Sequence, residues 1–334
     1  MKNLFIGVDF SKLTIDVSFF EPEKFDAFSH CQFFNNKDGF KAMLGWLKKQ
    51  SAIPPSQWMF CGEHTGLYSL NLSEYLSAKG LFIWIDTPLQ IKHSMGIQRS
   101  KNDKVDSEQL ALYGYRFRDK AKAYVSKRKE CKALQLLSAY RERLIKARGA
   151  LSQAATEMRA VIKRDPAAYY VYEKTGQQVN RLKKDIKDVE MKMMEYIEKS
   201  PALYKNYMLL VSITGIAFVN ASSMLIHTDN FTRFATARQY TCYVGTAPFG
   251  KDSGTSTKIH PRVSNVANKT VKALLTQAAK CAVIHDPELR EYYHRKRAEG
   301  KNDRLVTNNV RYKLISRCFS VINRQEPYQK DYLK

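Results

Sequence analysis

Two aspartates three residues apart, Asp103 and Asp106, stand at the predicted start of a helix in a polar segment of the chain. The spacing puts both carboxylates on one helical face near the positive end of the helix dipole, with Lys101 and Lys104 beside them. Carboxylates held together favour a cation between them, and Mg²⁺ takes such oxygens together with water and substrate phosphate. The pair therefore predicts metal-assisted phosphate chemistry, although acidic residues are also ordinary in the first turn of a solvated helix.

Two more acids stand near the ends of predicted strands. Asp9 interrupts an apolar run over 4–10, where it shares one strand face with Gly7 and Phe5. A carboxylate so late in a buried strand is costly unless it binds something. Glu63 follows a short apolar strand over 57–61, and ligands gather beyond the carboxyl ends of strands in open α/β sheets. Asp9 and Glu63 thus join the aspartate pair as candidate site residues.

A third candidate lies in residues 249–258, which are rich in glycine, hydroxyl groups and lysine and are predicted to form a loop. Such a loop binds phosphate through its backbone amides, and Ser253, between Lys251 and Lys258, is also suited to be a nucleophile. Ser256 shares these surroundings, so the choice between the two serines stays open. A polar surface loop without chemistry explains the composition equally well.

The segment before residue 127 alternates strand and helix patterns that would position these acids. Strands are predicted over 4–10, 13–20, 28–34, 57–61 and 81–85, and helices over 37–49 and 67–79, with a loop through Pro88 before the helix that Asp103 opens. This order, with acids on the first strand, after the fourth strand and on a late helix, is the pattern of an RNase H-like α/β nuclease fold.

The rest of the chain is predicted to be mainly helical. Over 127–199 apolar residues follow a 3-4 repeat through Ile162, with Arg141 and Arg148 in the seam and a break at Pro166. We expect an antiparallel helical hairpin or coiled coil in which the arginines set register, although they are also suited to contact nucleic acid. Its apolar stripe would be unsatisfied if exposed on a monomer, which favours self-association.

Short helices follow over 201–245, and basic helices run from Asn265 towards the end. The predicted fold class is therefore α/β plus all-α. The predicted domains are 1–126, 127–200 and 201–334.

The composition indicates a polyanion as partner. Among 334 residues, 55 Lys and Arg stand against 32 Asp and Glu, a net charge of +23, which is typical of proteins that bind nucleic acid. Six dispersed cysteines indicate neither a zinc site nor a disulfide framework. No signal peptide is predicted, and no apolar stretch approaches the ~20 residues that span a membrane. A cytoplasmic protein without a membrane partner fits these features.

Taken in order, the motifs resemble the DEDD-type insertion-sequence transposases and Piv-like site-specific invertases, across nearly the whole chain. The acidic tetrad of that family matches Asp9, Glu63, Asp103 and Asp106. Its C-terminal signature matches Gly245-Thr-Ala-Pro248 followed by Ser253-Gly-Thr-Ser256, with the family's proposed serine nucleophile at Ser253. Each motif alone is weak, whereas four in order are specific.

The resemblance implies a RuvC-like catalytic domain, joined by the helical hairpin to a C-terminal transposase domain that carries the serine loop. It implies strand exchange between donor and target DNA, and, as in members studied as RNA-guided recombinases, a noncoding guide RNA. The tetrad would hold Mg²⁺ or Mn²⁺ while Ser253 attacks the phosphate. Two departures from the family pattern, Ile213-Thr-Gly-Ile-Ala217 and Ala267-Asn268, leave this chemistry untouched.

Recombination needs at least two active sites on two duplexes, so we expect a homo-oligomer, either a dimer or a tetramer. Two alternative functions stay open. A RuvC-like nuclease or resolvase would use the same metals to activate water and would end the reaction as hydrolysis. A non-catalytic nucleic-acid-binding scaffold would rely on the hairpin and the basic tail, and its binding would survive the loss of every acid.

Overall fold

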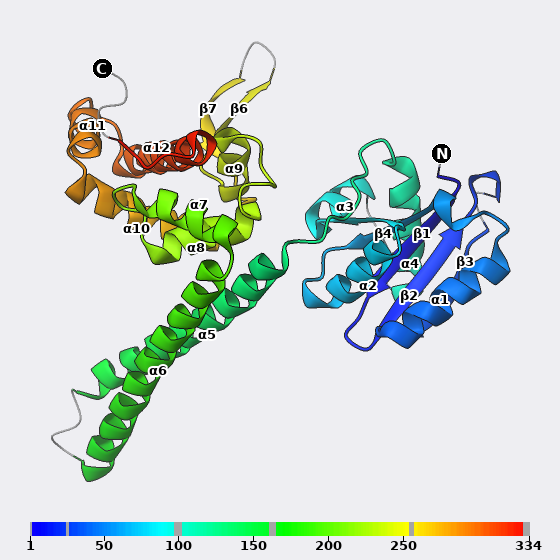
Figure 1. The fold of residues 1–334 in the computed structure, drawn as a ribbon, viewed down its shortest axis with the longest axis horizontal. Helices are drawn as coiled ribbons and strands as arrows, with labels where there is room; N and C mark the ends of the chain where they lie inside the picture. The colour runs from blue at the N-terminus through cyan, green and yellow to red at the C-terminus, as the bar shows by residue number, and fades with distance from the viewer. Residues whose placement is uncertain (1, 25–26, 97–101, 160–164, 254–256, 330–334) are drawn as a thin grey trace. The chain divides into compact units, whose positions relative to one another are not determined.

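The computed structural model describes residues 2–24, 27–96, 102–159, 165–253 and 257–329, and for residues 250–262 it describes no side chains. The chain divides into two compact units, Met1–Ser126 and Lys127–Lys334 (Figure 1). Within the described ranges, no helix is long and apolar enough to cross a membrane.

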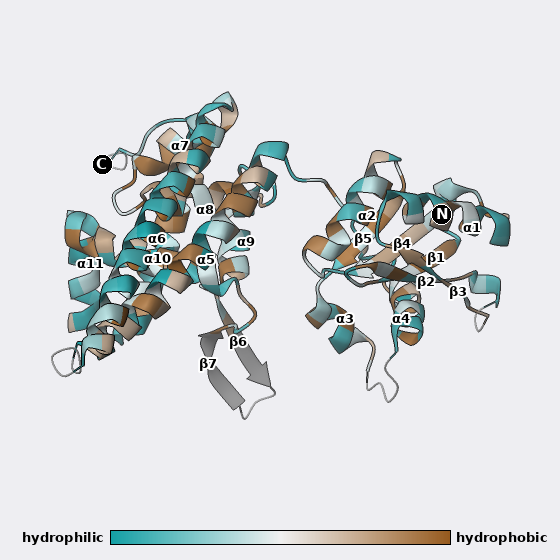
Figure 2. Ribbon diagram, turned by 90° about the horizontal axis from the view of Figure 1, so that it is seen from below, coloured by the Kyte–Doolittle hydropathy of each residue, from teal (hydrophilic) through white to brown (hydrophobic). Residues whose placement is uncertain are grey.

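The first unit is a five-stranded mixed sheet with helices on both faces. The strand order is β3-β2-β1-β4-β5, in which β2 is antiparallel to β1 and β3, whereas β4 is parallel to β1 and β5. Figure 2 shows α1 and α2 on one side of the sheet and α3 and α4 on the other. The elements are β1 (Leu4–Phe10), β2 (Thr14–Phe20), β3 (Ser29–Phe34), α1 (Lys37–Gln50), β4 (Trp58–Glu63), α2 (Leu67–Ala78), β5 (Phe82–Asp86), α3 (Pro88–Ser94) and α4 (Asp103–Arg116).

Alternating side chains of the strands build one core on each face of this sheet. Leu4, Ile6 and Val8 are fully buried in the core that α1 and α2 cover. Phe5 points the other way and packs in the core that α4 covers. A strand buried on both faces reads as a continuous apolar run, which is why the sequence predicts β1 so well.

The short helix α3 corrects one prediction. A loop was expected through Pro88, but Pro88–Ser94 form a helix. Thr87 caps it by accepting a hydrogen bond from the backbone nitrogen of Gln90, and Pro88 takes a position in the first turn where its missing N–H is not needed. The cap and the proline together start a helix that periodicity does not reveal.

The second unit, in its described residues, is helical apart from one β-hairpin. The elements are α5 (Lys129–Met158), α6 (Pro166–Glu198), α7 (Pro201–Val211), α8 (Phe218–Thr228), α9 (Ala237–Val244), β6 (Pro248–Ser253), β7 (Thr257–Val263), α10 (Lys269–His285), α11 (Pro287–Ala298) and α12 (Asp303–Arg324). The predicted combination of an α/β part with a mainly helical part is therefore confirmed.

The two longest helices, α5 and α6, pack side by side as the expected antiparallel hairpin (Figure 1). Helix α6 restarts at Pro166 as predicted, and Asp165 caps it by accepting from the backbone nitrogen of Ala167 at 2.8 Å. Ile162, which the repeat included, lies outside the described residues.

The apolar seam of this hairpin is closed within the chain. Ile186 and Val189 of α6 are buried together with Leu144 of α5. The Arg141 guanidinium donates from Nε to Oε1 of Glu190 at 2.7 Å, so this arginine sets the pairing of the two helices. Each helix therefore covers the apolar stripe of the other within one chain, and self-association through the hairpin stays a prediction.

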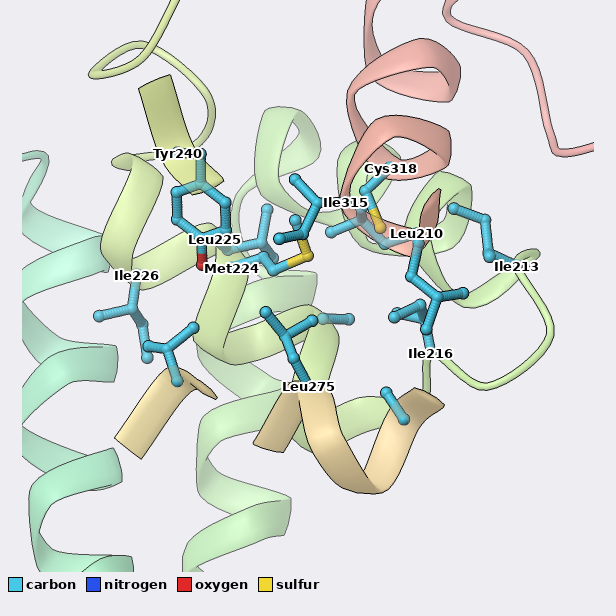
Figure 3. Close-up of a cluster of buried hydrophobic side chains, with 14 of the residues drawn as sticks. Leu210, Ile213, Ile216, Met224, Leu225, Ile226, Tyr240, Leu275, Ile315 and Cys318 are labelled. Atoms are coloured by element: carbon cyan, nitrogen blue, oxygen red, sulfur yellow. The ribbon is translucent and has the colours of Figure 1, made fainter. Parts of the chain in front are cut away.

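The shorter helices of the second unit surround a common apolar core. Figure 3 shows Tyr240 of α9, Leu225 of α8 and Leu275 of α10 near Ile315 and Cys318 of α12. The hairpin β6–β7 lies between α9 and α10 in the chain, and both helices contribute to this core. The two ends of the β6–β7 hairpin are therefore held by well-packed helices.

Candidate active site

Asp9 and Glu63 lie at the carboxyl ends of neighbouring parallel strands. The ladder between β1 and β4 pairs Val8 with Gly62, and each acid is the next residue on its strand. Parallel strands in register point paired residues to the same face of the sheet, so both carboxylates belong to the face that α4 covers. The strand ends thus bring together two of the predicted site residues.

Helix α4 packs unusually closely on that face at Gly7. A Cβ added to Gly7 would lie 1.9 Å from the Ser107 carbonyl oxygen and 2.4 Å from the backbone nitrogen of Ala111. The hydroxyl groups of Ser18 and Ser107 also share a hydrogen bond of 2.6 Å between β2 and α4. Glycine in β1 therefore allows the backbone of α4 to approach the strand that carries Asp9.

The first turn of α4 carries the aspartate pair, as the sequence predicts. Asn102 caps the helix by accepting from the backbone nitrogen of Val105 at 2.8 Å. Asp103 is exposed and Asp106 is half-buried. Lys104 points its ammonium towards Glu108, 3.9 Å away, and Lys101 lies outside the described residues.

The charges of these aspartates reach Asp9. Burial, and after it the negative charges of Asp106, Asp103 and, least, Asp16, together raise the pKa of Asp9 to about 6. The hydrogen bond from the Phe10 backbone acts against this rise. The carboxylates of Asp103 and Asp106 on α4 and of Asp16 on β2 therefore all repel the half-buried carboxylate of Asp9.

The donor set fits a hard divalent cation. Carboxylate oxygens are the ligands that Mg²⁺ prefers, and carboxylates that repel one another gain stability when a cation binds among them. Within the part of the chain that the structure describes, no three His, Cys, Asp or Glu side chains are gathered closely enough to hold a metal ion. An ion held by one or two of these carboxylates would complete its coordination shell with water and substrate phosphate.

Two further acids, Asp16 and Asp86, border the site. The sequence patterns did not identify either of them. Asp16 of β2 pairs with Asp9 across the ladder, and its buried carboxylate accepts from His30 Nε2 and Gln32 Nε2, both at 3.0 Å. Asp86 ends β5 opposite Glu63 and accepts from the Tyr113 hydroxyl at 2.8 Å. Asp16 reaches the site only through the pairing register of β1 and β2, which the sequence does not show directly.

The second unit holds the predicted nucleophile. Residues 249–258 were expected to form a loop, but most of this stretch belongs to the antiparallel strands β6 and β7. Ser253 is the last residue of β6 and pairs with Thr257, so it stands at the turn of the hairpin. Ser256 lies outside the described residues.

The glycine of the Gly-Thr-Ala-Pro signature, Gly245, lies at the base of this hairpin, where there is no room for a side chain. Gly245 has a positive φ of 74°, and a Cβ there would lie 2.2 Å from the Cβ of Ala267. The Asn268 side chain donates to the Tyr243 hydroxyl at 2.8 Å, and that hydroxyl lies 3.0 Å from Nδ1 of His227. Burial and nearby cations lower the pKa of His227 to about 4, so its ring is neutral beside the tyrosine hydroxyl. The departures at Ala267 and Asn268 are thus accommodated at the base.

Comparison with known proteins gives one assignment for both units. Residues 6–163 match a family profile described as a transposase, of the DEDD type of IS110 elements. Residues 207–294 match a profile described as the transposase IS116/IS110/IS902 family. The pilin gene-inverting proteins of Moraxella bovis and Moraxella lacunata are each 25% identical to this chain, with 99% of both chains covered. A 43.6 kDa uncharacterized protein of insertion element IS110 from Streptomyces coelicolor is 32% identical over 34% of this chain and 28% of its own length.

These matches, with an acid-bearing α/β unit followed by a basic helical unit, define an enzyme of the DNA transposase and recombinase class. The chain belongs to the DEDD-type transposases of the IS110 family. The resemblance found in the sequence is therefore confirmed.

Proposed function

We propose that this transposase cuts and exchanges strands between donor and target DNA at a site built from four acids and one serine. The acids are Asp9, Glu63, Asp103 and Asp106, and the nucleophile is Ser253. The observation that supports the acid site most is the raised pKa of Asp9, to which the charges of Asp106 and Asp103 contribute. The names of the Moraxella relatives support inversion of a DNA segment as one form of the reaction.

We also propose that the first unit has an RNase H-like, RuvC-like fold. Three antiparallel strands followed by two parallel ones, with the acids on the face under α4, support this assignment. The hairpin over 127–200 and the helices over 201–334 then act as separate functional domains, one for assembly and one for the serine.

The acids prepare the phosphate in this scheme. When bound, Mg²⁺ or Mn²⁺ polarises the scissile phosphate and offsets its developing charge. Asp9 on β1 and the pair on α4 are held by the close packing at Gly7, and Glu63 on the next strand completes the set. The close packing keeps acids from two elements on one side of the substrate.

In this scheme Ser253 becomes covalently bonded to the cut DNA strand. Its Oγ attacks the phosphorus, the bond from phosphorus to the leaving deoxyribose oxygen breaks, and that oxygen takes a proton and leaves as a hydroxyl. The serine proton passes to water or a carboxylate. The resulting phosphoserine ester is then attacked by a deoxyribose hydroxyl of another strand, which restores the serine. The scheme requires Ser253 and the acids to meet at one phosphate, within one chain or between subunits.

Trapping the covalent intermediate tests this mechanism. The reaction is denatured on a nicked DNA whose released fragment diffuses away, and any protein–DNA adduct is mapped by peptide analysis. We expect an adduct on Ser253 that is absent from Ser253→Ala and present in Ser256→Ala. An adduct on Ser256 would move the nucleophile, and normal cleavage by Ser253→Ala without an adduct would assign the attack to water.

Conservative substitutions test the acids. Asp9→Asn and Asp106→Asn are expected to abolish strand exchange and to leave DNA binding nearly intact, because only the metal-dependent step needs the charge. Asp38→Asn, on an exposed carboxylate of α1, is the matched control and should keep full activity. Full exchange by either acid variant, or in excess chelator, would refute the acid site.

A homo-oligomer is the proposed working state, and the hairpin offers residues to test it. Leu182 and Val189 face α5, so their replacement would disrupt the hairpin itself. Leu136 and Tyr140, one turn apart on α5, are instead exposed. The double variant Leu136→Glu with Tyr140→Glu should convert the oligomer to an inactive, folded monomer in light scattering. A fully active monomer would contradict the proposal.

A noncoding guide RNA is proposed as a further partner, from the family resemblance and the net charge of +23. Protein purified from its host should carry a discrete RNA, and ribonuclease should remove its choice of target. Site-specific exchange by protein free of RNA would exclude a guide.

A further inference from the structure

Two cations of the second unit, Lys272 on α10 and Arg311 on α12, influence each other's charge, and within the described residues neither forms an ion pair, although the negative charge of Asp303 acts on Arg311. The charge of Arg311 and, more strongly, burial lower the pKa of Lys272. Arg311 is half-buried, and its Nε has no hydrogen-bond partner there. Like charges held side by side in a partly dry setting repel each other unless an anion binds between them.

Both cations are fixed at one place by hydrogen bonds to the chain that enters the β6–β7 hairpin. Lys272 Nζ donates to the Gly245 carbonyl at 2.7 Å, and Asn308 Nδ2 donates to the Thr246 carbonyl at 2.7 Å. Arg311 Nη1 donates to Asn308 Oδ1 at 3.1 Å. Within the described residues these bonds leave Nη2 of the guanidinium and two ammonium hydrogens for a ligand, whereas Nε is buried.

The geometry points to a phosphate-binding site: we propose that Lys272, Asn308 and Arg311 bind one phosphodiester of the DNA strand that the β6–β7 hairpin engages. The inference rests on the proposed function, because it takes DNA as the substrate and Ser253 as the residue that meets it. The remaining guanidinium and ammonium donors suit phosphate oxygens, because charged donors make short, strong hydrogen bonds to phosphate. A phosphate would also separate the two like charges. The site would anchor the strand at the base of the hairpin that carries the serine.

Charge-removing substitutions in the full chain test the site. Lys272→Gln and Arg311→Gln should each weaken binding of a labelled duplex uniformly across sequences and reduce the slope of log affinity against log salt by about 1. Arg311→Lys should restore the slope. Lys313→Gln is the matched control on α12, because its ammonium already pairs with Glu288 and should contribute little to DNA binding.

The outcomes separate the possible roles of these residues. A folded Arg311→Gln variant with the wild-type slope and affinity would overturn the site, and a lower melting temperature with unchanged affinity would show that the residues only support the hairpin. Loss of RNA binding with DNA binding intact would overturn the DNA assignment. Wild-type protein that binds no DNA at any salt would instead refute the proposed function.

A second measurement needs no variant. An amine-acetylating reagent is applied to wild-type protein with and without DNA, and the modified lysines are mapped. DNA should protect Lys272 and leave Lys313 reactive. Equal modification of Lys272 with and without DNA would overturn the site even where the substitutions impair folding.

Discussion

Replacing Gly7 by alanine is expected to separate the acid on β1 from the acids on α4. The added Cβ would lie 1.9 Å from the Ser107 carbonyl oxygen, and real Cβ atoms essentially never come closer than 3.0 Å to such atoms. Relief of this contact moves the helix away from the strand by about 1 Å. The atoms in the way are helix backbone and cannot rotate aside, so we expect the upper end of the overpacking range, about 3 kcal/mol of unfolding free energy.

Urea unfolding and NMR titration of Asp9 measure both effects of Gly7→Ala. Stability should fall, the pKa of Asp9 should drop from about 6 towards its ordinary value as Asp106 and Asp103 move away, and strand exchange should be lost. Gly45→Ala is the matched control, because Gly45 is exposed within α1 and nothing lies within 4 Å of its Cβ. That substitution should stabilise the protein by roughly 0.5–1 kcal/mol. A Gly7→Ala protein with wild-type stability and an unchanged Asp9 pKa would refute the reasoning.

Three further outcomes are expected. Asp9→Asn should stabilise the metal-free protein at pH 8 by about 1–2 kcal/mol after discounting for solvent screening. The pKa of Asp9 is about 6 in the folded protein against 3.8 ordinarily, so its charged form destabilises the fold above pH 6. The stabilisation by Asp9→Asn should therefore shrink below pH 6 and vanish below pH 4. A stabilisation that does not change with pH would contradict this explanation. Arg317→Ala should lower the unfolding free energy by about 3 kcal/mol, because the buried Asp286 loses the guanidinium 2.6 Å away and keeps only its capping hydrogen bond from the Leu289 backbone. Lys296→Ala, which removes only a surface ion pair, should change the unfolding free energy by less than about 0.5 kcal/mol. The logarithm of the DNA affinity should fall linearly with the logarithm of the salt concentration, with a slope of about −0.9 for each phosphate contacted, and a flat response would argue against a nucleic-acid partner.

Long and strongly patterned elements were predictable from the sequence. The apolar run around Val8 gave β1, the acidic first turn gave the start of α4, and Pro166 gave the restart of α6. These features depend on local composition and on a period of two or 3.6, which the sequence carries directly.

Features that depend on partners distant in the chain were not predictable. The strands β6 and β7 hold one glycine, several charged residues and two prolines, a composition typical of loops, and only their pairing makes them strands. Asp16 becomes a neighbour of Asp9 only through the register of β1 and β2. The contact of Gly7 with α4 leaves no side-chain pattern at all, because its defining property is a missing atom.

The helical hairpin also sets a length scale. Its helices contain 30 and 33 residues, which at 1.5 Å per residue makes an arm of about 45–50 Å. One turn of duplex DNA is about 34–36 Å long. An assembly built on contacts along such an arm would therefore offer an interface longer than one helical turn of DNA.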